Sequence, residues 1–276
     1  MTKRLQVLSL GAGVQSTTMA LMAAHGEITP MPDCAIFADT MHEPKAVYDH
    51  LTWLQSVLPF PVHIVSKGDL WEAVTTIKRT KDGKRTYTET GLPVYTVGQE
   101  ADGFGLRQCT RNFKIDPINR EVRRLLGKSR VTKRDGVLVD MWIGISVDEI
   151  MRRKPNAKPF INSRWPLIEK QFTRQSCLDW LEKNGYPVAP RSACTFCPYH
   201  SDVEWLRLTP AEFADAVVKE KQLQQAYAAT TVLETTPFFH ADRIPLDQVQ
   251  LNPAERPQKM WQLDMFNNEC EGMCGV

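Results

Sequence analysis

The feature that most constrains the fold is an apolar run that begins at Leu5, breaks at Gly11 and Gly13, and resumes with helical spacing as far as Met22. This pattern predicts a buried strand, a tight loop and a helix. The first N–H groups of such a helix have no acceptor within the helix, and the helix dipole adds partial positive charge. The loop from Gly11 to Thr17 is therefore a candidate phosphate-binding site that needs no lysine.

Two common phosphate-binding motifs fit this loop poorly. A dinucleotide fingerprint requires a third glycine where this chain has Ser16, and a Walker loop requires a Gly-Lys-Ser/Thr sequence that the loop lacks. An ordinary glycine-containing turn between a strand and a helix remains an alternative. If the loop binds phosphate, we expect the hydroxyl groups of Ser9, Ser16 and Thr17 to add hydrogen-bond donors.

Two further apolar segments, Cys34–Asp39 and Val62–Ser66, have the character of buried strands, and a helix is expected to begin at about Pro44. Strands that alternate with helices are typical of a parallel sheet. In open sheets of this kind, ligands lie at the carboxyl ends of the strands. The loop at Gly11 and the segment Asp39–Glu43 are therefore expected to meet at one edge of the sheet.

The seven cysteines indicate metal or redox chemistry rather than disulfides. They are odd in number, and they include the pairs Cys194-x-x-Cys197 and Cys270-x-x-x-Cys274. The sequence also has no apolar run long enough to span a membrane and no signal-peptide pattern. We therefore expect a cytoplasmic protein with no membrane partner.

Positive charge is concentrated in the middle of the sequence. Residues 78–134 contain 15 Lys or Arg against six Asp or Glu, whereas residues 201–276 contain six against 12. Such an excess suits binding of a polyphosphate or a nucleic-acid backbone, with a solvated basic surface as the alternative. Within this region the segment Lys78–Leu106 lacks hydrophobic periodicity, and we expect it to be a mobile lid or substrate loop.

The loop Gly11–Ser16 resembles the Ser-Gly-Gly-x-Asp-Ser pyrophosphate loop (PP-loop) of the adenine-nucleotide α-hydrolase superfamily, which includes sulfonucleotide reductases and ATP pyrophosphatases. Its first position carries glycine instead of the family's serine, and Gln15 replaces the family's aspartate. The segment Phe37–Pro44 is similar to the second motif of the phosphoadenosine phosphosulfate (PAPS) reductase branch, in which Asp39 and Thr40 match.

A third segment, Arg107–Ile118, is similar to the Cys-Cys-x-x-x-Lys-x-x-Pro segment of iron-sulfur adenylyl-sulfate reductases. The motif's first cysteine, its lysine and its proline are matched by Cys109, Lys114 and Pro117 at the same spacing. Its second cysteine is replaced by Thr110. By this resemblance one potential cluster ligand is missing.

The segment Ile143–Arg153 follows a predicted buried strand and resembles a further motif of the same family. Gly144, Glu149 and either Arg152 or Arg153 are the nearest matches, and Ser146 replaces the usual first arginine. Because guanidinium groups bind phosphate oxygens in bidentate geometry, these arginines are candidates for anion binding, with a surface helix of paired charges as the alternative.

The resemblance implies a Rossmann-like α/β fold of the HUP type, a parallel sheet with helices on both faces. Residues 1–170 would form the PP-loop nucleotide-binding domain, and residues 171–276 a helical, cysteine-containing extension packed on it. The residues expected to bind the nucleotide are Ser9, Gly11, Ala12, Gly13, Gln15, Ser16, Thr17, Asp39, Thr40, Gly144, Glu149 and Arg153. The residues expected to act in catalysis are Asp39, which would also bind Mg²⁺, Lys114, Arg152, Cys270 and Cys274.

The pair Cys194 and Cys197 falls where iron-sulfur reductases carry a C-x-x-C sequence. With Cys109 these thiolates would hold a four-iron four-sulfur cluster. His200 lies three residues beyond Cys197, so a zinc site with three cysteines and this histidine is an alternative, as is a site without metal.

The resemblance leaves three hypotheses about function. The first is an enzyme that binds ATP, adenylates an acceptor with release of pyrophosphate, and transfers sulfur to a nucleic acid or nucleotide with the help of a sulfur donor. The second is a reductase of adenylyl sulfate or phosphoadenylyl sulfate, in which Cys270 or Cys274 attacks sulfur and a thioredoxin-like partner restores the thiol. The third is a nucleotide- or nucleic-acid-binding module without catalytic activity. A homodimer is compatible with each of these.

Overall fold

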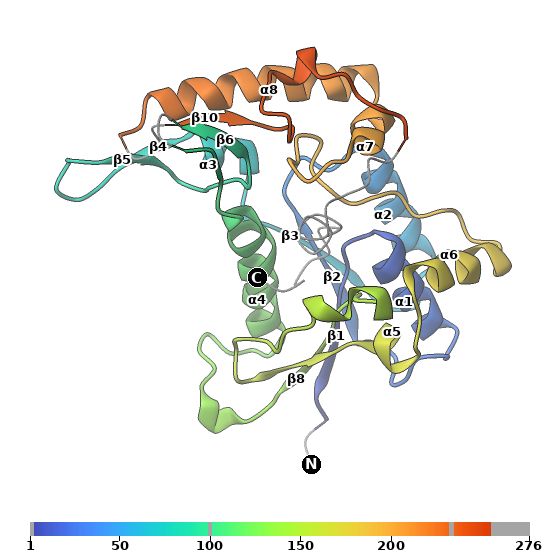
Figure 1. Ribbon diagram of the computed structural model, residues 1–276. Coiled ribbons are helices and arrows are strands. Elements are labelled where there is room, and N and C mark those ends of the chain that lie inside the picture. The colour runs from blue at the N-terminus through green and yellow to red at the C-terminus, as the bar shows by residue number, and fades with distance from the viewer. Residues whose placement is uncertain (1–2, 99–100, 232–234, 255–276) are drawn as a thin grey trace.

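The computed structural model describes residues 3–98, 101–231 and 235–254. Its centre is a five-stranded sheet in which every pairing is parallel and the strand order is β3-β2-β1-β8-β9 (Figure 1). The strands are β1 (Leu5–Ser9), β2 (Cys34–Asp39), β3 (Val62–Ser66), β8 (Val139–Trp142) and β9 (Ile161–Arg164). The expected α/β fold with a parallel sheet is therefore confirmed.

Helices cover both faces of this sheet because successive strand residues point to opposite sides. Leu8 packs in a core with residues of α1, α2 and α6, whereas its neighbour Val7 packs with Ile118 and Val122 of α4. The helices are α1 (Val14–Ala24), α2 (Lys45–Val57), α4 (Asp116–Leu125), the short α5 (Pro166–Glu169) and α6 (Arg174–Lys183). Strand β1 therefore lies between two cores, and Leu10 and Ala12 of the loop that follows it pack in the first.

A third core lies beyond the edge formed by β3. It joins α3 to the long helix α8 and includes the buried side chains of Phe113, Phe196 and Phe239. A small antiparallel sheet of order β10-β6-β7 adjoins α8 (Figure 1). The elements of this region are α3 (Leu70–Thr75), β6 (Tyr95–Gly98), β7 (Gly103–Phe104), α7 (Asp202–Arg207), α8 (Pro210–Ala228) and β10 (Thr235–Phe238).

The start of α8 shows why the sequence folds this way locally. Glu212 N donates to Thr209 Oγ1 at 3.2 Å, and Thr209 N donates to Glu212 Oε2 at 2.9 Å. This reciprocal pair is a capping box, and Pro210 occupies the first helical position, where its missing N–H has no consequence. Helix α8 therefore begins at Pro210 and continues to Ala228.

The segment Lys78–Leu106, expected to be a mobile lid or substrate loop, is not irregular throughout. The segment contains most of a hairpin of β4 (Ile77–Arg79) and β5 (Thr86–Thr88), followed by β6 and β7. These strands are two to four residues long, too short to produce a recognisable alternation of apolar and polar residues. Figure 1 shows the basic β4–β5 hairpin extending from the body of the molecule.

Four short helical turns complete the described elements. They are the π-helix η1 (Thr110–Ile115) and the 3-10 turns η2 (Lys133–Asp135), η3 (Val147–Arg152) and η4 (Leu246–Gln248). The described residues include no helix with both the length and the apolar character to cross a membrane.

Candidate functional site

The carboxyl ends of the five parallel strands meet at one edge of the sheet. Ser9 ends β1 and Asp39 ends β2, with β1 and β2 adjacent in the sheet, and Trp142 ends β8 on the other side of β1. The segments that follow these strands carry the predicted nucleotide-binding residues. This is the edge at which open parallel sheets bind their ligands.

The loop after β1 turns sharply and leaves the first N–H groups of α1 without acceptors inside the helix. Ala12 has a φ of 60°, and Gly13 is the N-cap residue with no side-chain cap. The first intrahelical bond runs from Thr17 N to Gly13 O at 3.0 Å. The N–H groups of Val14 and Gln15 therefore have no acceptor within α1, as is usual at a helix terminus that can bind an anion.

Two predicted hydroxyl donors are already engaged within the protein. Ser16 Oγ accepts a hydrogen bond from Gly11 N at 3.2 Å and donates to Gly13 O at 3.4 Å, so it fixes the shape of the loop. Thr17 Oγ1 lies 3.0 Å from Nε2 of the buried His50 on α2. The hydroxyl of Thr17 thus joins α1 to α2.

The buried His50 makes stability depend on pH. Burial lowers the pKa of His50 from 6.5 to about 4. Between these values only the unfolded chain takes up the proton, so the free energy of unfolding must fall as the pH drops from about 6.5 to about 4, by about 3 kcal/mol in all. Urea unfolding at a series of pH values measures this fall. In His50→Gln, which keeps a hydrogen-bonding group, this contribution should disappear, and an unchanged pH profile would contradict the assignment.

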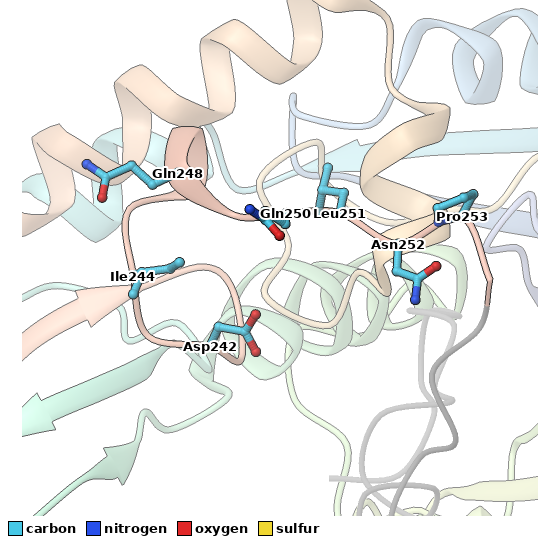
Figure 2. A pocket seen from close by; sticks show the side chains of 7 residues that line it. All are labelled: Asp242, Ile244, Gln248, Gln250, Leu251, Asn252 and Pro253. Atoms are coloured by element: carbon cyan, nitrogen blue, oxygen red, sulfur yellow. The ribbon is translucent and has the colours of Figure 1, made fainter.

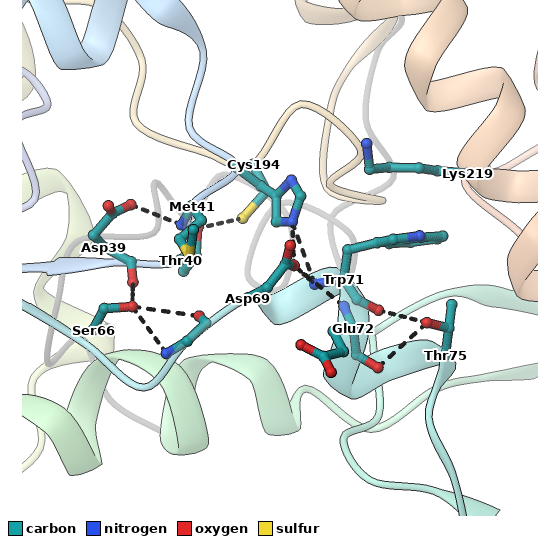
Figure 3. Close-up of polar contacts among 12 residues, drawn as sticks. Asp39, Thr40, Met41, Ser66, Asp69, Trp71, Glu72, Thr75, Cys194 and Lys219 are labelled. Carbon is teal, nitrogen blue, oxygen red and sulfur yellow. Dashed lines mark hydrogen bonds and ion pairs between the residues drawn. The ribbon is translucent and has the colours of Figure 1, made fainter.

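Asp39 lies at the end of β2 with its carboxylate held by local donors. Met41 N donates to Asp39 Oδ1 at 2.7 Å, and Tyr48 Oη donates to the same oxygen at 2.9 Å. The hydroxyl of Ser66, at the end of β3, donates to the Asp39 carbonyl at 2.8 Å. Figure 3 shows Asp39 and Thr40 at this edge, with Thr40 directed toward Cys194.

A chain of polar side chains crosses the edge beside α1. Arg174 Nη1 donates to Gln15 Oε1 at 3.0 Å, and Gln15 Nε2 donates to Glu149 Oε2 at 3.2 Å. Glu149 Oε1 in turn lies 2.7 Å from Arg152 Nη1. The structure therefore brings three predicted residues, Gln15, Glu149 and Arg152, together with Arg174, to which the sequence analysis gave no role.

Two other predicted residues of this motif have different surroundings. Gly144 is buried just after β8, at the end of the strand beside β1. The guanidinium of Arg153 lies 5.3 Å from the ring centroid of Trp165, a cation–π contact, and Arg153 is exposed.

Cys109, Cys194 and Cys197 line one cavity, although 85 residues separate the first two in the sequence. The cavity has a volume of about 30 Å³, and Thr40 and Lys114 also line it. Thr40 Oγ1 lies 3.3 Å from Cys194 Sγ. The cysteine cavity is therefore linked by one side chain to the edge of the sheet where the loop lies.

His200 does not line this cavity. Its ring packs edge to face on Trp205, with centroids 4.6 Å apart, and its Nδ1 has no hydrogen-bond partner among the described residues. Burial lowers the pKa of His200 to about 3. Cys270 and Cys274 lie outside the described residues.

A buried ion pair adjoins the cavity, which Lys114 lines. Lys114 Nζ lies 3.0 Å from Glu43 Oε1, and the two side chains are 5% and 0% exposed. Ser192 Oγ donates to Glu43 Oε2 at 3.1 Å. Lys114 comes from the π-helix η1, a type of helical irregularity that is common at functional sites.

Glu43 was present in the sequence motif but was given no role. The available signal was its position four residues after Asp39, which ends a buried strand, so that a carboxylate would lie near the ligand edge. Its partner Lys114 is 71 residues away in the sequence, so the pairing itself left no local pattern.

The chemistry of the three thiols bears on which metal or cofactor the cavity could hold. Burial and the nearby carboxylate of Glu43 raise the pKa of the Cys194 thiol well above 9, against the opposite effect of Lys114. The described residues contain no group of three or more His, Cys, Asp or Glu side chains that converges on a point suited to one metal ion. Zinc would need its thiolate ligands about 2.3 Å from one point, an arrangement that the described side chains do not show.

A second hollow lies outside this edge, on the chain that follows β10 (Figure 2). It contains none of the residues predicted for nucleotide, metal or catalysis. Its lining residues are Asp242, Ile244, Gln248, Gln250, Leu251, Asn252 and Pro253.

Comparison with protein families finds no family model that matches the chain, and comparison with curated proteins finds no match. Among solved structures the chain is similar to phosphoadenylyl-sulfate (PAPS) reductase from Candida auris, determined as a phosphate complex. The match has 15% sequence identity and a TM-score of 0.42, and it covers 68% of this chain and 76% of that chain. A similarity of this size establishes neither family nor activity, and the α/β fold rests on the sheet order of the chain itself.

Proposed function

We propose that this protein is an enzyme that binds an adenine nucleotide with its phosphates at the N-terminus of α1 and performs sulfur chemistry at the neighbouring cysteine cavity. The observation that carries the proposal is the contact of Thr40 with Cys194. Thr40 directly follows β2, which pairs with β1, so the loop and the cavity lie along the same sheet edge. A nucleotide held by the loop would have reacting groups within reach of this edge.

The reaction that we favour is adenylation of an acceptor. An acceptor oxygen would attack the α-phosphorus of ATP, forming one P–O bond, while the bond to the β-phosphate oxygen breaks and pyrophosphate leaves with the electron pair. The N–H groups at the start of α1 and the guanidinium of Arg152 would bind phosphate oxygens, and Asp39 would bind Mg²⁺. Most of the rate would come from positioning and charge neutralisation.

The cavity would hold an iron-sulfur cluster through Cys109, Cys194 and Cys197. Such a cluster, with only three protein thiolates, would supply an iron with an open position for sulfur. The ammonium of Lys114 would attract the thiolates, against the repulsion from its partner Glu43. The acceptor would be a nucleic acid or nucleotide, toward which the basic residues of 78–134 provide positive charge.

Titration of anaerobically purified protein with ATP, adenylyl sulfate and phosphoadenylyl sulfate tests this proposal. We expect uptake of ATP, release of pyrophosphate when an acceptor is supplied, and release of AMP only after sulfur has displaced the adenylate from the acceptor. Ser16→Ala should weaken ATP binding about tenfold, because Ser16 shapes the loop through two hydrogen bonds. Ser56→Ala, an exposed change on α2, is the matched control and should leave binding unchanged.

Two results would contradict the favoured reaction. Release of ADP and phosphate would show attack at a different phosphorus. Conversion of adenylyl sulfate or phosphoadenylyl sulfate to sulfite with a thiol reductant would instead support sulfonucleotide reduction.

A further inference from the structure

Arg174 is the residue of the ligand edge for which neither the motifs nor the proposed function gives a role. It is the first residue of α6, and α6 packs against α1. Its side chain reaches the first turn of α1, where it donates to the carbonyl oxygen of the Gln15 amide at 3.0 Å. The N-terminus of α1 therefore has a guanidinium beside it that comes from a different helix.

Gln15 is suited to bridge Arg174 and Glu149 in a way that a carboxylate is not. Its carbonyl oxygen accepts from Arg174 while its NH₂ group donates to Glu149. A carboxylate can only accept, so an aspartate or glutamate here would repel Glu149 instead of binding it. Gln15 is fully buried, which fixes its amide between the two partners.

This group places two guanidinium groups near the loop. Arg174 and Arg152 carry two positive charges, and Glu149 supplies one negative charge between them. The backbone N–H of Arg174 donates to Asp148, whose carboxylate is exposed. An anion at the start of α1 would therefore meet two guanidinium groups.

A separate observation also indicates a ligand here. The hydroxyl of Ser146 is fully buried and has no hydrogen-bond partner among the described residues. Ser146 directly precedes the turn η3 that carries Glu149 and Arg152. A buried hydroxyl of this kind is uncommon, and an anion or an ordered water bound at this edge would satisfy it.

We propose that Arg174 is a phosphate-binding residue, and that Gln15 holds its guanidinium where it binds the second of two linked phosphates while the N-terminus of α1 binds the first. This inference rests on the proposed nucleotide site and deepens it. The ligand class it selects is a compound with two consecutive phosphate groups, such as a nucleoside polyphosphate or pyrophosphate. In this arrangement Arg174 contacts the second phosphate directly, so its contribution to binding does not require a metal ion.

Isothermal titration with inorganic pyrophosphate and inorganic phosphate, in the presence of EDTA, tests the inference. Arg174→Ala should weaken pyrophosphate binding about 10- to 100-fold and change phosphate binding less than threefold (about the effect of one charge-assisted hydrogen bond). Arg174→Lys keeps the charge but not the planar guanidinium. Its affinity for pyrophosphate should lie between those of Arg174→Ala and the natural sequence. The hydrogen bond from the backbone N–H of residue 174 to Asp148 does not involve the replaced side chain. The start of α6 should therefore be preserved in these variants.

Two controls separate a local contact from other effects. Lys183→Ala removes the same charge from the exposed far end of α6 and should leave both affinities unchanged. Gln15→Ala should weaken pyrophosphate binding in the natural sequence but add nothing in the Arg174→Ala background, because Gln15 acts through Arg174.

Equal pyrophosphate affinity in Arg174→Ala and the natural sequence would overturn this inference while leaving the nucleotide site intact. A natural protein that binds neither pyrophosphate nor ATP would overturn the proposed function as well. Equal losses for phosphate and pyrophosphate would also overturn the inference, since they would place Arg174 at the first phosphate.

Discussion

Glu43→Ala is expected to lower the free energy of unfolding by about 3 to 5 kcal/mol, because it leaves the ammonium of Lys114 buried without a counter-charge. Ser192 would also lose its hydrogen-bond acceptor. Urea unfolding at neutral pH measures the change. Both side chains are almost completely excluded from water, so solvent cannot replace the lost carboxylate.

The matched control is Asp49→Ala, which breaks the exposed ion pair of Lys45 and Asp49 on α2. That change should cost at most about 1 kcal/mol, as exposed ion pairs do. The double replacement Glu43→Leu with Lys114→Met should cost much less than Glu43→Ala, because no charge remains buried. A loss below 1 kcal/mol in Glu43→Ala would show that Lys114 finds another partner.

Cys194→Ser is expected to remove the iron-sulfur cluster proposed for the cavity. The change removes one of the three thiols that line the cavity. The serine hydroxyl takes the place of the thiol as the partner of Thr40 Oγ1. Iron and acid-labile sulfide per chain should fall to the background level, and the absorbance near roughly 400 nm that thiolate-ligated clusters show should disappear.

Cys177→Ala is the control for this experiment. Cys177 is fully buried in α6 and packs in the core with α1, away from the cavity. The Cys177→Ala variant should keep the iron content of the natural protein. Full iron content in Cys194→Ser, or zinc without iron in the natural protein, would exclude the proposed cluster.

The sequence predicted the central sheet because its signals are local. The run from Leu5 to Met22 contains the strand, the turn glycines and the helix spacing within one stretch, and the structure has β1 and α1 there. The capping box at Thr209 is a local signal of the same kind, because its two residues are three positions apart. The strands in Lys78–Leu106 escaped detection because each is too short to show a period.

The contacts that complete the candidate site join distant parts of the sequence. Lys114 and Glu43 are 71 residues apart, and Arg174 and Gln15 are 159 residues apart. A pattern of hydrophobic spacing carries no information about which charged side chains will meet across a sheet edge. The motifs therefore indicated Gln15 and Lys114, whereas only the fold shows their partners.

The arrangement of the cysteine cavity fixes when it can form during synthesis. Thr40 and Glu43 leave the ribosome first, Cys109 and Lys114 follow, and Cys194 and Cys197 come much later. The turn that carries Cys194 is then anchored to the early chain by the bond from Thr195 N to His42 O at 2.9 Å. Any cofactor delivered to these thiols must therefore arrive after translation has passed residue 197, so a partly made chain could not retain it.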